Sequence, residues 1–270
     1  MTTHRLLNRR MAIAEMGKAG LAVVVFGTAA CSDPAGTGTT ATTAGASAST
    51  TAPPSPTTTG GATSTSEQSG TTTAPTATAF QRVNLDFVSA YILYRGREAA
   101  LVDTGVDGSA DAIDAALGEA GLTWGEVGHV ILTHKHPDHV GSVDAVMERA
   151  PGASLYAGEA DIPEIASAVA PQSVGDGDRV FDLEVIASPG HTPGHICILD
   201  ASAGILVAGD AMVGADGGVG GPDPSFAEDM DLALGSVRKL AGFSYEVALF
   251  GHGEPVLKGA SAAVSALAEG

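Results

Sequence analysis

THKHPDHVG, residues 133–141, places His134, His136, Asp138 and His139 within six positions of a chain that has eight histidines in all. In an extended loop, the alternation His-x-His brings two imidazoles within reach of one ion, and the adjoining Asp-His pair can serve a second ion. Imidazole with carboxylate suits zinc, iron or manganese better than calcium or magnesium, which prefer oxygen ligands. The stretch therefore predicts a metal site. The alternative is a solvated histidine-rich loop, although such a pattern rarely arises by chance.

Four ligands from one loop do not complete two coordination spheres, so a metal site requires further His or carboxylate side chains at strand ends elsewhere. Three such residues follow along the chain. His191 lies in SPGHTPGH, Asp210 ends the apolar run GILVAGD, and His252 lies in LFGHGEP directly after YEVALF. The sequence thus offers seven candidate ligands in four separate segments.

The order His-x-His-x-Asp-His, Gly-His, Gly-Asp and Gly-His resembles that of the metallo-β-lactamase superfamily of metal-dependent hydrolases. The resemblance covers residues 80–270 and includes LVDTG, residues 101–105, which is similar to a segment that precedes the metal loop in that family. It implies the fold class α/β, as an αββα sandwich of two mixed β-sheets flanked by helices, with two metals between the sheet edges.

The resemblance also divides the candidate ligands into two sets that share one member. His134, His136 and His191 would bind one ion, Asp138, His139 and His252 the other, and Asp210 would bridge them. A bridging carboxylate partly neutralises two dications that lie about 3.5 to 4 Å apart and share a water. Such a water loses its proton near neutral pH and becomes the nucleophile.

The implied reaction is hydrolysis of a small carbonyl substrate (an ester, lactone, thioester or amide) by metal-bound hydroxide. Asp138 is the expected catalytic residue, because it can hold its ion and orient the hydroxide. The expected cofactors are two divalent ions, Zn²⁺ in the first place, with Fe or Mn as alternatives. Metallo-β-lactamases proper usually have Cys or Ser where Asp210 stands, so the superfamily name does not give the activity.

Two other functions remain open at this point. One is a mononuclear iron oxygenase of the persulfide dioxygenase type, which resembles the same superfamily and uses fewer ligands. The other is a non-catalytic metal-binding surface lipoprotein. Substrate specificity in this fold resides in loops such as residues 213–224 and the segment around Phe87.

The remaining candidate residues are expected to support the site or the core. His129 alternates out of a strand and is interpreted as a surface or packing residue. His195 either hydrogen-bonds near a metal ligand or packs in its turn, and Asp103 is expected to accept a hydrogen bond from a ligand imidazole. Cys197, in the apolar run HICIL, is interpreted as a small core residue.

Hydrophobic patterning predicts an alternation of strands and helices after residue 80. Strands are expected at 87–96, 97–105, 127–133, 154–158 and 246–250, and several short ones between 174 and 210. Helices are expected at 109–121, 140–150, 159–170 and 225–242, the last opening with a capping box from Ser225 to Glu228, and a short Ala-rich helix follows residue 256. The Gly-rich residues 213–224 lack Lys and Arg and are interpreted as a mobile loop near the site.

The first 79 residues differ in composition from the rest. Residues 1–31 have a basic start and a twelve-residue apolar run that ends at Cys31, which fits an export signal. TAAC, residues 28–31, resembles a bacterial lipobox, and Arg9-Arg10 resembles a twin-arginine signal, with the general secretory route as the alternative. Residues 32–79 are almost entirely Thr, Ala, Ser, Gly and Pro, which predicts a disordered stalk.

These segments predict an exported protein, either lipid-anchored at Cys31 on the extracytoplasmic face of the cell membrane or secreted. Residues 80–270 are expected to form one hydrolase domain, which contains 9 of the 13 Lys and Arg and 28 of the 31 Asp and Glu, a net charge near −19. This acidity excludes a nucleic-acid partner, because phosphate binding needs clustered Lys and Arg. The expected partner is a small-molecule substrate, with membrane contact only through the lipid anchor. The sequence leaves the oligomeric state open.

Overall fold

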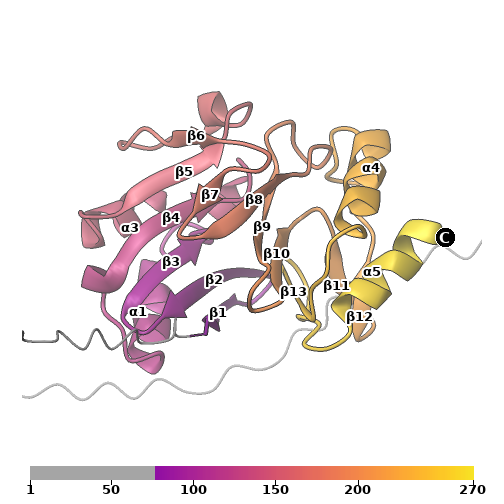
Figure 1. Cartoon of the computed structure of the whole chain (residues 1–270). Helices are drawn as coiled ribbons and strands as arrows, with labels where there is room; N and C mark the ends of the chain where they lie inside the picture. Colours follow the sequence, from indigo (N-terminus) through magenta and orange to yellow (C-terminus); the bar gives the residue numbers. More distant parts are fainter. Residues whose placement is uncertain (1–76) are drawn as a thin grey trace, which may run out of the picture. The chain divides into compact units, whose positions relative to one another are not determined.

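The computed structural model describes residues 77–270 (Figure 1). The predicted export signal, the lipobox and residues 32–76 of the predicted stalk lie outside the described residues. The described chain begins with Ala77 and Thr78, and the Thr78 hydroxyl donates a hydrogen bond of 2.5 Å to the Asp200 carboxylate. The first strand starts at Ala79.

The first sheet contains six strands that lie side by side in sequence order. The three N-terminal strands pair antiparallel, and the later ones pair parallel. The strands are β1 (Ala79–Leu85), β2 (Val88–Arg95), β3 (Glu98–Val102), β4 (Val127–Leu132), β5 (Ser154–Gly158) and β6 (Gln172–Val174). The sequence did not predict β1, because this edge strand has only one fully buried residue, Val83, and hence a weak apolar pattern.

The second sheet has five strands in the order β13-β10-β9-β8-β7, and only the β10–β13 pairing is parallel. Its strands are β7 (Arg179–Val180), β8 (Leu183–Ala187), β9 (Ile196–Asp200), β10 (Ile205–Gly209) and β13 (Val247–Phe250). A separate hairpin joins β11 (Val213–Ala215) to β12 (Gly218–Gly220). Residues 213–220, interpreted from the sequence as a loop, therefore form a β-ribbon.

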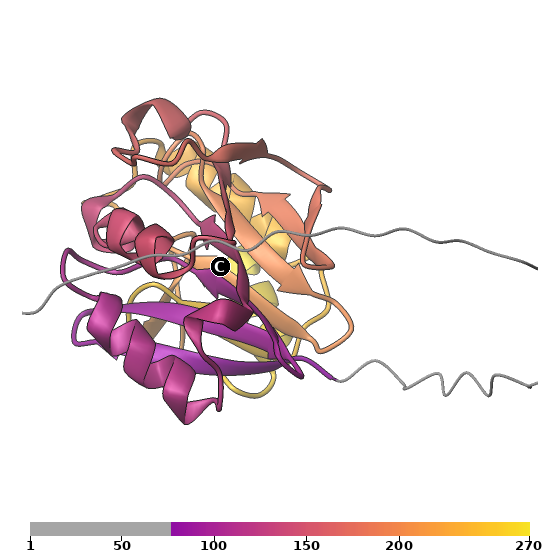
Figure 2. The same ribbon diagram turned by 90° about the vertical axis from the view of Figure 1, so that its left-hand side faces the viewer.

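The helices lie on the outer faces of the two sheets (Figures 1 and 2). One core joins the first sheet to α1 (Ala110–Glu119) and α3 (Val143–Arg149), and another joins the second sheet to α4 (Met230–Leu240) and α5 (Ala260–Glu269). A third core lies between the sheets. The side chains of β2 alternate between two of these cores. Ala90 and Ile92 face the helices, whereas Tyr91 and Leu93 face the second sheet. The predicted αββα sandwich of two mixed sheets is confirmed.

Two helix predictions were also wrong. Residues 159–170 form only a short 3₁₀ turn, η2 (Ile162–Glu164), because Pro163 lacks an N–H and the Asp161 side chain is engaged elsewhere. The helix predicted from Ser225 begins at Met230, and Asp229 caps it by accepting from the Leu232 N–H. Residues 228 and 229 cannot join the helix, because their N–H groups donate to the His191 and Gly190 carbonyls.

Four strands end at one edge of the sandwich, and the candidate site lies there. The strands β3, β4, β10 and β13 lead directly into Asp103, Thr133, Asp210 and Gly251. Within residues 77–270, no helix combines the length and the apolar character needed to cross a lipid bilayer.

Candidate metal centre

Local sequence explains the conformation of the histidine loop. Pro137 opens the one-turn helix α2 (Pro137–Val140), where its missing N–H costs no hydrogen bond, and it keeps the preceding His136 extended, with φ −64° and ψ 144°. The imidazole of His136 therefore projects from an extended loop, whereas Asp138 and His139 project from the helical turn. The Thr104 N–H and hydroxyl both donate to the His139 carbonyl and hold this turn against the end of β3.

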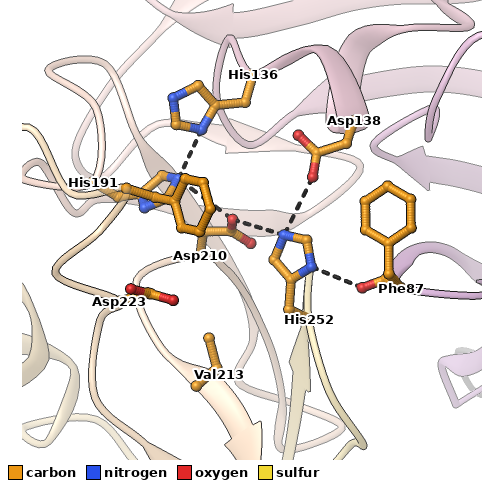
Figure 3. Close-up of a pocket in the computed structure, with 9 residues that line it drawn as sticks. Phe87, His136, Asp138, His191, Asp210, Val213, Asp223 and His252 are labelled. Atoms are coloured by element: carbon orange, nitrogen blue, oxygen red, sulfur yellow. Dashed lines mark hydrogen bonds and ion pairs between the residues drawn. The ribbon is translucent and has the colours of Figure 1, made fainter. Parts of the chain in front are cut away.

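Three imidazole nitrogens converge in a first cluster. His136 Nδ1 lies 3.0 Å from His134 Nε2. The same nitrogen lies 2.9 Å from His191 Nε2 (Figure 3). Around a tetrahedral zinc with Zn–N bonds of about 2.0 to 2.1 Å, nitrogen atoms lie roughly 3.3 Å apart. The three rings are thus spaced like the ligands of a single ion.

A second cluster lies beside the first. His252 Nε2 is 3.3 Å from Asp138 Oδ2, and His139 Nε2 is 3.9 Å from the same oxygen. Asp210 stands between the clusters: its Oδ2 lies 3.3 Å from His191 Nε2 and 3.2 Å from His252 Nε2, and its Oδ1 lies 3.4 Å from His139 Nε2. All seven residues that the sequence singled out therefore meet in one place, in the two sets expected and with Asp210 between them.

The hydrogen bonds behind the histidines fix which ring nitrogen carries a proton. Asp103 accepts from both the Thr133 N–H (2.7 Å) and the Thr133 hydroxyl (2.8 Å). Because the hydroxyl proton is used there, His134 Nδ1–H donates to the Thr133 oxygen at 3.0 Å. His134 Nε2 is left with a free lone pair that faces the cluster.

Two other histidines are oriented in the same way. His139 Nδ1–H donates to Asp103 Oδ2 at 2.8 Å, and His252 Nδ1–H donates to the Phe87 carbonyl at 2.8 Å. The expected hydrogen bond from a candidate ligand imidazole to Asp103 is confirmed. Asp103 has a left-handed φ of 63°, a conformation that Asp tolerates better than most residues, and its carboxylate accepts three hydrogen bonds there.

His195 holds the backbone of Asp210. Its Nε2 accepts from the Asp210 N–H at 3.0 Å, and its Nδ1 contacts the Ser188 hydroxyl at 2.8 Å. Burial lowers the pKa of His195 to about 3, so the ring is neutral and can accept. Of the two roles considered for His195, the hydrogen-bonding one is confirmed.

The electrostatics of the two clusters differ. Burial lowers the pKa of His191 to about 4, whereas hydrogen bonds to Asp138 and Asp210 raise the pKa of His252 to about 10. Negative potential is therefore concentrated between the two carboxylates, and a divalent cation would be attracted by the same field.

Two of the buried atoms that lack a hydrogen-bond partner within residues 77–270 face each other. These atoms, His139 Nε2 and Asp210 Oδ1, are 3.4 Å apart but poorly aligned for a hydrogen bond. Unpaired buried polar atoms cost about 1 to 3 kcal/mol each, and a shared cation would satisfy both. The donor set and its geometry therefore fit divalent metal ions.

The comparisons with known proteins agree with this geometry. The profile of the metallo-β-lactamase superfamily matches residues 83–252. The chain belongs to the metallo-β-lactamase superfamily. In Bacillus subtilis (strain 168), the uncharacterized protein YobT is 30% identical over 197 residues (62% of this chain, 83% of the relative). The probable metallo-hydrolase YflN of the same organism is 29% identical over 204 residues (58% and 75%). The structure of TTHA1623 in a di-iron-bound form is 27% identical, has a TM-score of 0.51, and covers 62% of this chain and 88% of that one.

The metallo-β-lactamase fold leaves a pocket of about 450 Å³ over the two clusters. Its floor consists of His136, Asp138, His191, Asp210 and His252, and its walls of Phe87, Val213, Asp223 and Phe226 (Figure 3). Both segments expected to hold specificity, 213–224 and that around Phe87, thus border the pocket. Away from the pocket, His129 packs beside the Tyr156 and Phe181 rings, and Cys197 is fully buried in the core, as expected.

Sequence reasoning missed one residue that supports this candidate metal site, Asp161. Its fully buried carboxylate accepts from the Lys135 N–H (3.1 Å), the Thr192 hydroxyl (2.6 Å) and the Gly194 N–H (2.7 Å). It thereby joins the loop that carries His136 to the loop that carries His191. The sequence did contain a signal for this residue, because Asp161 ends the segment EAD that directly follows strand β5. The segment was instead interpreted as part of a helix.

We expect Asp161→Asn to weaken binding of the first ion by about 10- to 100-fold, the usual range when a group that supports metal ligands is lost. In the variant, the side-chain amide presents an N–H group to a donor from which the wild-type carboxylate accepts a hydrogen bond. That hydrogen bond is lost, so the spacing between His136 and His191 is no longer fixed. Competition with a chelator would measure the affinity of the full chain for each of the two ions. Asp144→Asn is the control, because Asp144 also accepts a backbone N–H, from Ala168, on the exposed surface. Unchanged affinity for both ions would contradict this role.

Proposed function

We propose that the protein is an exported hydrolase that uses two divalent metal ions to cleave a small carbonyl substrate, such as an ester, lactone, thioester or amide. One observation carries the proposal: the Asp210 carboxylate lies between two histidine clusters, with its two oxygens 3.2 to 3.4 Å from His191, His252 and His139. The similarity of the chain to the probable metallo-hydrolase YflN supports metal-dependent hydrolysis as the reaction class.

When bound, two ions would acidify a shared water and polarise the substrate carbonyl. The protein contributes position and charge. Asp210 partly neutralises both ions, and the outer hydrogen bonds of Thr133, Asp103 and Phe87 aim the histidine lone pairs at the centre. This preorganisation removes the need to reorder ligands during the reaction.

Asp138 is the residue suited to handle the proton of the attacking water. A hydrogen bond with His252 lowers its pKa, so the carboxylate is ionised. It also lines the pocket, where about a quarter of its side chain is exposed (26%). An ionised carboxylate at this position can accept a hydrogen bond from the water and orient it toward the carbonyl carbon.

The side chains that line the pocket offer no hydroxyl, thiol or amine as a nucleophile. Among the described residues that border it, none is a Ser, Cys, Thr or Lys. Cys197 is no substitute, because burial raises the pKa of its thiol to about 12. Direct attack by water is therefore the mechanism that these residues support.

The metal proposal is tested by removal and return of the ions. We expect a chelator to abolish ester hydrolysis by the full chain, and Zn²⁺, Mn²⁺ or Fe²⁺ to restore it as two ions bind per chain. Elemental analysis of the purified protein gives the stoichiometry, and esters, lactones, thioesters and β-lactams form the substrate screen. One iron per chain with oxygen consumption would instead establish the oxygenase. Metal binding without turnover of any of these substrates would favour the surface lipoprotein.

The proposal includes export and membrane anchoring, and both rest on the sequence of residues 1–79. The basic start, the apolar run and Cys31 support an export signal with a lipid attachment site, and the Thr-rich residues 32–79 support a stalk. Mass spectrometry of the mature N-terminus tests this. A lipidated Cys31 as the first residue is the expected result, and an unprocessed Met1 would contradict export.

A further inference from the structure

We propose that the pocket selects carbonyl substrates whose other parts are apolar and either neutral or positively charged, and that it discriminates against substrates bearing a carboxylate. The inference rests on the proposed hydrolase function and adds a substrate class to it. Three features of the pocket carry it: its aromatic walls, its lack of Lys and Arg side chains and the carboxylate of Asp223.

The walls of the pocket expose large apolar side chains. Phe87, in the β1–β2 turn, is 58% exposed, and Phe226, in the segment before α4, is 65% exposed. Phe87 also stacks on the His252 ring at a centroid distance of 6.2 Å, so it is placed next to the reacting centre. Val213 adds a third apolar contact. Burial of an apolar substrate group against such walls is favourable, because it removes apolar surface from water.

Within residues 77–270, no Lys or Arg side chain lines the pocket to receive a substrate carboxylate away from the metal clusters. All nine Lys and Arg after residue 80 are described, and none borders the pocket. Six of them form ion pairs with carboxylates elsewhere. Lys135, in the histidine loop itself, pairs with Glu164 and Glu228, and its side chain is only 10% exposed.

Asp223 is the one carboxylate of the pocket that belongs to neither metal cluster. The charges of Asp138 and Asp210 would be offset by bound ions, whereas Asp223 has no cationic partner in the described part of the chain. Its side chain accepts one hydrogen bond, from the Ser225 N–H at 2.8 Å. In Figure 3 it lies on the His191 side of the pocket, away from Phe87.

The segment that carries Asp223 is firmly attached to the metal loops. The Asp223 carbonyl accepts from the Ala227 N–H at 3.0 Å, and the next residue, Glu228, donates its N–H to the His191 carbonyl at 3.1 Å. Lys135 adds an ion pair of 2.9 Å to the Glu228 side chain. The Asp223 charge is therefore held at a fixed place beside the pocket, where it can distinguish substrates by charge.

The test compares 4-nitrophenyl esters of three chains of equal length: hexanoate, 6-aminohexanoate and the monoester of hexanedioic acid. We expect kcat/KM for the carboxylate-bearing ester to be at least tenfold below that for the other two. The acetate ester should be hydrolysed at least tenfold less efficiently than the hexanoate ester, because it leaves the apolar walls unfilled. A carboxylate-bearing ester that is the best substrate would overturn the inference.

Asp223→Asn should reduce the preference for the amino ester over the carboxylate ester by about three- to tenfold, the effect of one partly exposed charge. Asp223→Lys should reverse the preference. The matched control is Asp216→Asn, because Asp216 is an exposed aspartate at the turn of the β11–β12 hairpin, seven residues before Asp223, and does not border the pocket. An unchanged preference in both Asp223 variants would refute the role of this residue.

A binding measurement separates this inference from the hydrolase proposal. Calorimetric titration of the chelator-treated full chain with 2-phenylethylamine requires no catalysis. Binding of the amine that weakens severalfold in Asp223→Asn but not in Asp216→Asn supports the charge preference even if no ester is hydrolysed. No amine binding, or equal binding in all variants, contradicts the preference even if esters are hydrolysed.

Discussion

Asp210→Asn is expected to lower kcat/KM for ester hydrolysis by about 10³-fold and to reduce the bound metal from two ions per chain to one or none. The carboxylate faces both clusters, and its two oxygens lie 3.2 to 3.4 Å from His139, His191 and His252. An amide keeps the shape but removes the charge that offsets two dications. Kinetics and elemental analysis on the same sample measure the two effects together.

The control for this variant is Asp231→Asn on the exposed face of α4, which should retain two ions and full activity. Full hydrolytic activity with two bound metals in Asp210→Asn would refute the bridging role. Loss of activity with both metals retained would restrict Asp210 to a catalytic function.

Gly251→Ala is expected to remove metal binding and activity almost completely, although only one methyl group is added. A Cβ at this position would lie 2.1 Å from Asp210 Oδ1 and 2.5 Å from His139 Cε1, so the carboxylate and the ring would both have to move. Displacement of about 1 Å in a catalytic site commonly costs 10²-fold in rate. Here the displacement affects candidate ligands of both proposed ions.

The matched control is Gly118→Ala in α1, where the added Cβ would meet no atom within 4 Å. That variant should be as active as the wild type and slightly more stable, by roughly 0.5 to 1 kcal/mol, because Ala favours the helix. Metal analysis, activity and thermal unfolding should be measured on both variants. A Gly251→Ala protein with two bound ions and normal kinetics would show that the ligands do not need this close approach.

The positions of the seven candidate ligands were predictable because each one has a local signature. The His-x-His-x-Asp-His segment follows a buried strand, and the remaining three ligands each follow a glycine in a turn or at a strand end. Glycine is informative here for a physical reason. At Gly251, for example, a side chain would collide with Asp210, so the residue before a ligand is constrained as strongly as the ligand.

Other features depended on contacts that no local pattern encodes. Asp161 was assigned to a helix because its three hydrogen-bond donors lie 26 to 33 positions away in the sequence. The capping box at Ser225 had the correct spacing, but the Glu228 and Asp229 N–H groups are held by the loop that carries His191. In both cases, tertiary hydrogen bonds override the local preference.

Each metal cluster draws ligands from both sheets of the sandwich. His134 and His136 follow a strand of the first sheet, while His191, Asp210 and His252 follow strands of the second. Ions bound here would act as non-covalent cross-links between distant parts of the chain, much as disulfides do, and metal binding would then stabilise the folded domain against unfolding. For a domain proposed to work outside the cell, where proteases are common, the same ions would then supply both reactivity and resistance to cleavage.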